Sequence, residues 1–468
     1  MKLKKIEITN FRCFETLTVP LHPDINVFVG VNAAGKTTIL DAIAIVLYDI
    51  VAANGGGGQR QRKGQGVALR PTDIHISPGA EDTVTGRRDF VQFRAQAGDY
   101  YELPDFPLTT PSGEQRVIEW TDYIQYSPPN NFSYDTSKSE RLNDIYRYFA
   151  ALWQEIRRSD ARALIPLPAV AYYRAHRRLS QMPKMGDIFS LQLERQDAFQ
   201  NALNAGADYQ AMAQWFYLRE NQELRERLQL RDDPDFEFPD LRAARLALVR
   251  ALDNVSRVFF DDNPPSLKVE FAGAAAAPNM LELEQLSDGY RNLLALILDF
   301  ARRLAQAHPG WDNPLEAPGI LLIDEIELHL HPGWQQTVIP NLQEAFPNTQ
   351  LIVATHSPQV LTTVRKEQVH FLTAQHTIEP LPVDVGTYGG ESAFVLETVF
   401  GVHTRPQNIQ TVDDLNTYLY LVEQRQHTTP QAQALRSKLE AALGAADPGL
   451  VRADMRVRQL EILSKQRN

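Results

Sequence analysis

One eight-residue stretch constrains the fold of this chain more than any other part of its sequence. The residues GVNAAGKT, positions 30–37, match the pattern G-x-x-x-x-G-K-[ST]. An apolar segment at 25–29 precedes them, and apolar residues at helical spacing follow them (TILDAIAIVLYDIVA). Small residues let successive backbone N–H groups surround phosphate oxygens, and the start of the following helix adds positive charge. The stretch therefore predicts a strand, a phosphate-binding loop and a helix, in this order.

The residues of this loop have distinct expected roles. Lys36 supplies an ammonium group for terminal phosphates, and the hydroxyl of Thr37 binds Mg²⁺. A chance glycine-rich turn is the competing interpretation, and the strand and helix on either side argue against it. The other predicted nucleotide contacts in this stretch are Gly30, Asn32, Ala33, Ala34, Gly35 and Thr38.

A second apolar run, GILLIDE, ends in the acidic pair Asp324 and Glu325. Continuous apolar runs of this kind are typical of strands buried on both faces of an α/β sheet, whose ligands bind at the carboxyl ends of the strands. We therefore expect Asp324 to hold Mg²⁺, directly or through water, and Glu325 to polarise an attacking water. Taken alone, the pair is explained equally well by an exposed strand end. His329 and His331 follow, but without a third ligand nearby they make a weak zinc site.

Two further segments carry candidate phosphate contacts. LSDGYRNLLALILDFARRLA predicts an amphipathic helix with Ser287 at its N-cap. Local evidence favours a simply capped helix, and the alternative is a second anion-binding helix start built from Ser287 and Gly289. The apolar run QLIVATHS places His356 at another strand end, where a helix-capping role with Ser357 competes with a role in the site.

Composition bounds the remaining possibilities. The chain has 468 residues, 43% hydrophobic and 22% charged, as in soluble globular proteins. It has no run of about 18 apolar residues, so we expect no membrane span. The single cysteine, Cys13, excludes an intrachain disulfide framework and favours a reducing cytoplasm. The net charge of −11 argues against bulk electrostatic coating of nucleic acid, and leaves a local basic groove open.

The order of the motifs resembles that of ABC-type ATPase heads: phosphate loop, helical insertion, LSDGY, ILLIDE and LIVATHSP. The opening KIEITNFRCFE is similar to the heads of RecF, SMC and OLD proteins rather than to those of membrane transporters. The segments LPAVAYYRAHRR, QWFYLRENQE and FVLETVFGVHTRP resemble stand-alone AAA-family ATPases of bacterial anti-phage systems, namely PtuA of Septu, retron-linked ATPases and the PARIS ATPase. The resemblance covers residues 1–50 and 280–365 well.

The resemblance implies an α/β fold, in which a mixed sheet core with an antiparallel β subdomain carries a helical insertion and a helical C-terminal extension. We expect an ATPase lobe with the phosphate loop and a β meander at 1–135 and a mainly helical insertion at 136–265. A second ATPase lobe is expected at 266–385, and the helical extension at 386–468.

The resemblance also implies ATP and Mg²⁺ as ligands of a composite site. Ser287 and Gly289 would close over ATP held by another subunit, His356 would contact the γ-phosphate, and Arg12 would lie near the nucleotide. Asp288 and Tyr290 depart from the usual LSGGQ signature, and Ala33 stands where a glycine is frequent. In LRPTDI, Asp73 occupies about the place of the Q-loop glutamine. These departures concern the rate of hydrolysis more than the binding of ATP.

The expected function is that of a cytoplasmic ATPase without a membrane partner. It forms a homodimer or a larger even-numbered oligomer through ATP, and gates a separate, nuclease-type effector in anti-phage defence. DNA or a phage-derived factor is the candidate trigger. The alternatives are a RecF-like DNA repair ATPase and a nearly non-hydrolysing nucleotide-binding scaffold that holds an effector inactive.

Two basic segments are candidate nucleic-acid contacts with strong competing interpretations. Tyr172, Tyr173, Arg174 and the basic residues at 176–178 combine aromatic rings with cations, which suits stacking on bases and contact with phosphates. A strand end followed by a solvated basic turn explains them as well. The tract at 54–66 is glycine-rich and basic, and a surface loop is its favoured interpretation.

Overall fold

The computed structural model divides into two compact units, residues 1–392 and residues 393–468. The four-part division expected from the sequence stays a prediction. Within residues 1–465 the description leaves out 55–68, 77–88, 104–116, 128–130, 135–141, 159–163, 176–192, 205–208, 230–234, 253, 263–264, 273–278 and 383. Residues 55–66 of the glycine-rich tract and the basic residues at 176–178 fall in these gaps, so both predictions lie outside the described residues.

The central sheet of the first unit carries the motifs. Its strand order is β14–β13–β3–β12–β11–β7, and all neighbouring pairs are parallel except β13 with β14. The predicted apolar strands are buried along their whole length, as β3, β11, β12 and β7 have no exposed residue. The bounds are β14 (Ile378–Glu379), β13 (Val369–Leu372), β3 (Ile25–Gly30), β12 (Thr349–Ala354), β11 (Gly319–Ile323) and β7 (Ala169–Tyr173).

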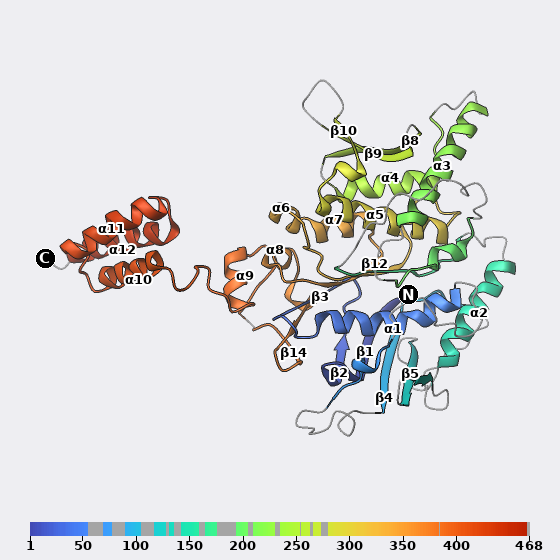
Figure 1. Cartoon of the computed structure of the whole chain (residues 1–468), viewed down its shortest axis with the longest axis horizontal. Helices are drawn as coiled ribbons and strands as arrows, with labels where there is room; N and C mark the ends of the chain where they lie inside the picture. The colour runs from blue at the N-terminus through green and yellow to red at the C-terminus, as the bar shows by residue number, and fades with distance from the viewer. Residues whose placement is uncertain are drawn as a thin grey trace. The chain divides into compact units, whose positions relative to one another are not determined.

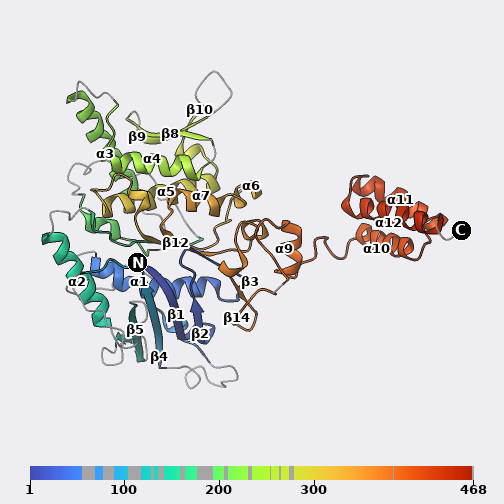
Figure 2. The same cartoon turned by 180° about the vertical axis from the view of Figure 1, so that it is seen from behind.

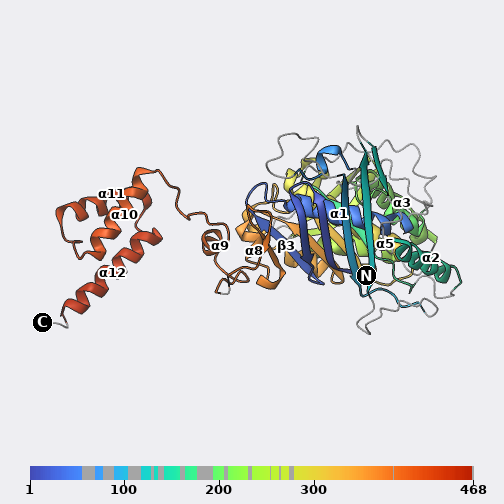
Figure 3. The ribbon, with the colours of Figure 1, turned by 90° about the horizontal axis from the view of Figure 1, so that it is seen from below.

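An antiparallel sheet with the order β2–β1–β4–β5–β6 forms the predicted β subdomain. Alternate residues of β1 point inward, and Ile8 of β1 lies opposite Phe93 of β4. Figure 3 shows these strands as the blue to teal arrows at the front of the first unit. The bounds are β1 (Lys2–Phe11), β2 (Phe14–Pro20), β4 (Phe90–Gly98), β5 (Ile118–Ser127) and β6 (Asn131–Tyr134).

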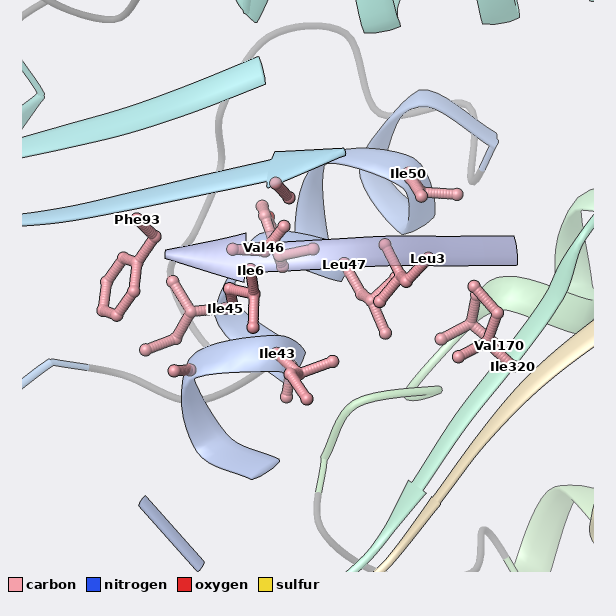
Figure 4. Packing of buried hydrophobic residues seen from close by; sticks show 14 of the residues in the cluster. Leu3, Ile6, Ile43, Ile45, Val46, Leu47, Ile50, Phe93, Val170 and Ile320 are labelled. Carbon is pink, nitrogen blue, oxygen red and sulfur yellow. The ribbon is translucent and has the colours of Figure 1, made fainter. Parts of the chain in front are cut away.

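Helix α1 (Lys36–Asn54) begins within the predicted phosphate-binding loop and runs between the two sheets (Figure 1). Figure 4 shows its side chains Ile43 and Leu47 in one buried cluster with Leu3 of β1 and Val170 of β7. By length and composition α1 could cross a membrane, but 83% of its apolar window is buried inside this unit. Burial between two sheets accounts for a helix that is apolar on all sides.

The opposite face of the central sheet is covered by helices α5 (Asp288–Ala307) and α7 (Val338–Ala345), and α4 (Pro239–Ala251) packs on the outer side of these two helices (Figure 2). A small antiparallel sheet of β8 (Val255–Asp262), β9 (Pro265–Phe271) and β10 (Asn279–Glu282) lies beyond α4. Helices α2 (Leu142–Arg158) and α3 (Tyr209–Gln229) supply most of the remaining helical part of the expected insertion. That region also contributes β7 to the central sheet, because the apolar AVAYY pairs in parallel with β11.

The second unit has its own apolar core. Helices α10 (Gln410–Glu423), α11 (Pro430–Leu443) and α12 (Pro448–Lys465) pack around Leu415, Tyr418 and Leu439. The helical character predicted for this end of the chain is therefore confirmed. Shorter helices along the chain are α6 (Pro332–Gln335), α8 (Pro358–Leu361) and α9 (Ser392–Thr398).

Candidate nucleotide-binding site

The predicted phosphate loop connects β3 to α1 and requires its small residues. Gly30 and Gly35 have positive φ angles of 152° and 107°, and Ala33 has 63°. A Cβ atom on Gly35 would lie 2.5 Å from Cζ of Phe14, and one on Gly30 would lie 2.2 Å from the carbonyl oxygen of Leu372. Backbone conformation and close packing thus both favour glycine at these positions. The left-handed conformation of Ala33 also explains why glycine is frequent there.

Lys36 is held across this loop. Its Nζ donates hydrogen bonds to the carbonyl oxygens of Gly30 and Val31, both at 3.0 Å. Burial lowers the pKa of Lys36 to about 8, although the carboxylates of Asp324, Glu327 and Glu325 oppose this shift. A phosphate group would satisfy the ammonium in place of the two carbonyls. The lysine is therefore in position to receive an anionic ligand.

Thr37 and Asp324 meet although 287 positions separate them in the sequence. The Thr37 hydroxyl donates to Oδ2 of Asp324 at 2.9 Å. This contact forms because the loop follows β3 and Asp324 follows β11, and the carboxyl ends of both strands lie at one edge of the parallel sheet. A hydroxyl and a carboxylate are oxygen ligands of the kind that Mg²⁺ prefers. The two residues therefore fit the metal expected at this site.

The residue after Asp324 has an unusual backbone conformation. Glu325 has a φ of 47°, which is uncommon for a residue with a side chain and is tolerated mainly at functional sites. Among the described residues, its carboxylate makes no hydrogen bond or ion pair with another side chain. The carboxylate is thus available to a water or ligand at the edge where Asp324 lies.

Glu327 anchors the loop that carries His356, a role that the sequence did not reveal. Its carboxylate accepts hydrogen bonds from the Thr355 hydroxyl at 2.7 Å and from the His356 backbone N–H at 2.5 Å. Burial and the charge of Lys36 lower the pKa of His356, against the carboxylates of Glu327 and Glu325. The imidazole is therefore close enough to the phosphate-loop lysine to be influenced by its charge.

Ser287 caps helix α5 as the local pattern predicts. Its hydroxyl accepts a hydrogen bond from the Tyr290 N–H at 3.4 Å. A Cβ atom on Gly289 would lie 2.1 Å from the carbonyl oxygen of His329, so the helix start packs directly on the loop after β11. The predicted action of Ser287 and Gly289 on a second subunit's nucleotide is not tested by this arrangement and stays a prediction.

Arg12 is anchored in the turn between β1 and β2 with a positive φ of 50°. Its guanidinium forms ion pairs with Asp41 at 2.7 Å and with Asp73 at 2.8 Å. Asp73, expected at the Q-loop position, therefore lies beside Arg12. Asp41 is buried on α1, four residues after Thr37, and was not predicted to matter.

A cavity of about 790 Å³ lies beside the phosphate loop. Phe14 and Cys13 in its wall also approach Gly35, and Nδ1 of His376 lies 3.2 Å from the carbonyl oxygen of Ala34. The wall combines apolar side chains, such as those of Phe14 and Ile74, with a larger number of polar and charged ones, and its place next to a phosphate site suits a nucleotide base. The sequence did not predict this cavity, because its walls come from three segments that are distant in the chain: the β1–β2 turn, residues 72–76 and the β13–β14 hairpin.

The basic–aromatic cluster at the end of β7 has another role than the stacking considered above. Tyr172 and Tyr173 are buried, so neither ring is available to stack on a nucleic-acid base. Their hydroxyls donate to Asp41 and Asp299, both at 2.7 Å. Arg174 forms an ion pair with Asp41 at 2.5 Å.

In the described part of the chain, no group of three or more His, Cys, Asp and Glu side chains could hold a metal ion.

The central parallel sheet, the phosphate loop and the Thr37–Asp324 contact are together the features of a P-loop nucleotide-binding domain. Two family models match the chain. An AAA ATPase domain matches residues 1–63, and an AAA domain described as a putative AbiEii toxin of a type IV TA system matches residues 177–362.

Individual proteins extend this similarity over the chain. The retron Ec83 probable ATPase of Escherichia coli is 26% identical over 529 residues, which covers 98% of this chain and 86% of that protein. The Septu protein PtuA of Bacillus mycoides is 44% identical over 77 residues, or 16% of this chain and 10% of that protein. Among solved structures, an SMC head bound to the C-winged helix domain of ScpA covers 81% of this chain and 97% of its own, with 16% identity and a TM-score of 0.45.

The predicted type of protein is thereby confirmed. The chain carries an ATPase domain of the ABC/AAA type and resembles the retron and Septu ATPases. The mixed sheet core with its antiparallel β subdomain is the fold expected for an ABC-type head.

Proposed function

We propose that this protein binds ATP with Mg²⁺ and hydrolyses it in the cytoplasm. The observation that carries the proposal is the contact between Thr37 and Asp324, with Lys36 and Glu325 at the same edge of the sheet. Mg²⁺, when bound by these oxygens, would neutralise charge on the phosphates. Lys36 and the backbone N–H groups of the loop would hold the phosphates, and the cavity beside them would take the base.

Glu325 is the residue we propose to orient the attacking water. It directly follows Asp324, the proposed Mg²⁺ ligand, and its backbone has a φ of 47°, a conformation that is tolerated mainly at functional sites. His356 and Lys36 would counter the charge that develops on the γ-phosphate. The energy of hydrolysis would drive a conformational switch.

We further propose that two copies close around ATP. Ser287 and Gly289 lie at the start of a 20-residue helix, and the N-terminus of such a helix favours an anion. In the proposed dimer this helix start faces the γ-phosphate held by the other copy. A missing Cβ at position 289 lets the helix start approach the His329 loop closely.

The proposed biological role is the gating of a separate effector, of the nuclease type, in anti-phage defence. The alignment with the retron Ec83 probable ATPase over 98% of the chain supports this role, with DNA or a phage-derived factor as trigger. A DNA repair ATPase would load repair factors instead, and a scaffold would hold its effector without turnover. Isolation of the native complex, with its bound protein and nucleic acid identified, separates these roles.

The Glu325→Gln variant tests the proposed chemistry. The amide keeps the size of the side chain but cannot accept a proton from water, so we expect normal ATP binding and a fall in turnover of about 100-fold or more. The variant should also accumulate as an ATP-bound dimer in size-exclusion chromatography with light scattering. Turnover at the wild-type rate would refute the role of Glu325, and absence of ATP binding by the wild type would refute the proposed function.

A mixing experiment tests the shared site. Lys36→Ala and Ser287→Arg should each be inactive alone, because the first loses phosphate binding and the second blocks the facing helix start. A hybrid dimer retains one site with Lys36 of one copy and Ser287 of the other, so mixing should restore part of the activity. Demonstrable hybrids without recovery would contradict the composite site.

A further inference from the structure

A network centred on the buried carboxylate of Asp41 joins three segments that are distant in the sequence. Oδ1 of Asp41 accepts hydrogen bonds from the Tyr172 hydroxyl at 2.7 Å and from Nη2 and Nε of Arg174 at 2.5 and 3.1 Å. Oδ2 accepts from Nη1 of Arg12 at 2.7 Å. One carboxylate on α1 therefore fixes an arginine from the end of β7 and another from the turn after β1.

The network lies next to the magnesium-binding pair. Asp41 follows Thr37 by four residues on α1, so the two side chains lie on the same face of the helix, one turn apart. The backbone N–H of Asp324 donates to the carbonyl oxygen of Tyr173 at 2.8 Å. Arg174 directly follows Tyr173, whose carbonyl oxygen binds the N–H of Asp324. It therefore lies at the edge of the sheet where the phosphate loop is.

The arginines retain access to a ligand. Asp41 is 3% exposed, whereas the side chains of Arg12 and Arg174 are 28% and 33% exposed. Arg12 has Asp73 as a second carboxylate, so its position does not depend on Asp41 alone. A guanidinium group that is fixed by one carboxylate and still partly accessible can bind a phosphate with well-defined geometry.

We propose that Arg174 contacts the terminal phosphate of ATP from the β7 side, with Asp41 and Tyr172 as its positioning residues. This proposal rests on the proposed function of the same site. The network holds the side chain of Arg174 over the start of α1, so little conformational freedom is lost when ATP binds. A terminal phosphate is the part of the ligand that distinguishes ATP from ADP, so Arg174 would contribute to that distinction.

The first experiment compares Arg174→Ala and Arg174→Lys with the wild type. Fluorescent ATP and ADP analogues measure binding, and steady-state assays measure kcat and KM. In Arg174→Ala we expect ATP affinity and kcat each to fall about tenfold or more, while ADP affinity changes less than about twofold. Lysine restores the charge but not the planar fork, so Arg174→Lys should be intermediate.

The second experiment uses the two adjacent tyrosines as a matched pair. Tyr172→Phe removes a hydrogen bond to Asp41, and Tyr173→Phe removes one of equal length to Asp299 on the other face of the sheet. We expect Tyr172→Phe to lower kcat several-fold and the ATP-to-ADP affinity ratio with it. Tyr173→Phe should lower the melting temperature without a change in that ratio.

The outcomes separate this proposal from the proposed function. An unchanged ATP-to-ADP affinity ratio in a folded Arg174→Ala variant would overturn the proposed contact between Arg174 and the terminal phosphate. The same conclusion would hold if the variant kept this ratio and lost only the stimulation of turnover by DNA. Equal effects of the two tyrosine variants on the ratio would overturn the positioning role. If the wild type bound ATP without hydrolysing it, the ratio would still test Arg174, and only the proposed hydrolysis would fail.

Discussion

Strand β7 connects two networks of the same composition on opposite faces of the central sheet. Successive residues of a strand point to opposite faces, so Tyr172 reaches Asp41 on α1 and Tyr173 reaches Asp299 on α5. Each aspartate also binds two arginines: Arg12 and Arg174 on the α1 face, and Arg302 and Arg303 on the α5 face. The two networks differ in where their arginines come from.

The Asp299 network is local and sealed. Arg302 and Arg303 follow Asp299 by three and four positions on the same helix, and they are 3% and 1% exposed. Arg303 also donates to the carbonyl oxygens of Ala198 and Gln200, both at 2.8 Å. Every part of this network is fixed by packing, so its contribution is to the stability of α5 against β7.

The Asp41 network is long-range and open to ligands. Its arginines come from segments 29 residues before and 133 residues after Asp41, and both guanidinium groups are partly exposed. Water can rehydrate such groups when a partner is lost, whereas it cannot reach those of Asp299. The same chemical groups therefore stabilise the fold on one face and remain available for binding on the other.

Replacement of each central aspartate by asparagine gives the largest expected contrast. Asp299→Asn leaves two buried guanidinium groups without a carboxylate, so we expect the free energy of unfolding to fall by about 3–5 kcal/mol. Asp41→Asn should cost only about 1 kcal/mol, because its arginines can turn to water or, for Arg12, to Asp73. Urea denaturation followed by circular dichroism measures both. A larger loss for Asp41→Asn would mean that the network at the nucleotide site is the structural one.

The sequence predicts the parts of the site that lie in contiguous motifs. The phosphate loop, the Asp324–Glu325 pair and the capped helix at Ser287 can be recognised because each depends on neighbouring residues and on local periodicity. Thr37 and Asp324 are both predicted to hold Mg²⁺, and the rule that ligands bind at the carboxyl ends of parallel strands places both at one edge, where the structure brings them into contact. These predictions needed no knowledge of the distant contacts.

The Asp41 network and the base cavity could not be predicted in this way. An aspartate within the apolar helix ILDAIAIVLYDIVA signals a buried partner, but the partner lies 131 residues away in β7. One wall of the cavity contains His376 from the β13–β14 hairpin, which reaches the phosphate loop only in the folded sheet. The aromatic pair Tyr172–Tyr173 suggested stacking on nucleic acid, and its burial shows that a pattern of residue types does not reveal which side of a strand is exposed.

Acid should weaken the packing at the end of α5. His308 ends α5, where Nδ1 donates to the carbonyl oxygen of Leu304 and Nε2 accepts from the Leu167 N–H. Burial lowers its pKa to about 4, below the usual 6.5. The unfolded chain therefore takes up a proton at a higher pH than the folded chain, and stability is lost as the pH falls from 6.5 towards 4.

We expect this histidine alone to cost about 2 kcal/mol of unfolding free energy between pH 7 and pH 5. Urea denaturation across this range, in the wild type and in His308→Gln, measures the difference in pH dependence rather than absolute stability. His370, whose pKa burial also lowers to about 4, should leave part of the dependence in the variant. An identical dependence in both proteins would exclude His308 as its source.

Alkali should instead weaken binding on the α1 face. The pKa of Lys36 is lowered to about 8, chiefly by burial, so its ammonium loses its proton in the free protein above that pH. Bound phosphates favour the charged form and raise the pKa again, so ATP binding becomes coupled to proton uptake. Between pH 7 and pH 9 we expect ATP affinity to fall roughly tenfold, because only about a tenth of Lys36 remains charged at the higher pH.

Isothermal titration of the nucleotide in buffers of different ionisation enthalpy reports both the affinity and the proton uptake. Lys36→Arg is the matched comparison, since arginine keeps its charge over this range, and its weaker binding should be independent of pH. If ATP affinity fell equally between pH 7 and pH 9 in Lys36→Arg, a group other than Lys36 would be responsible. The alkaline effect could then no longer be attributed to the phosphate loop on the α1 face.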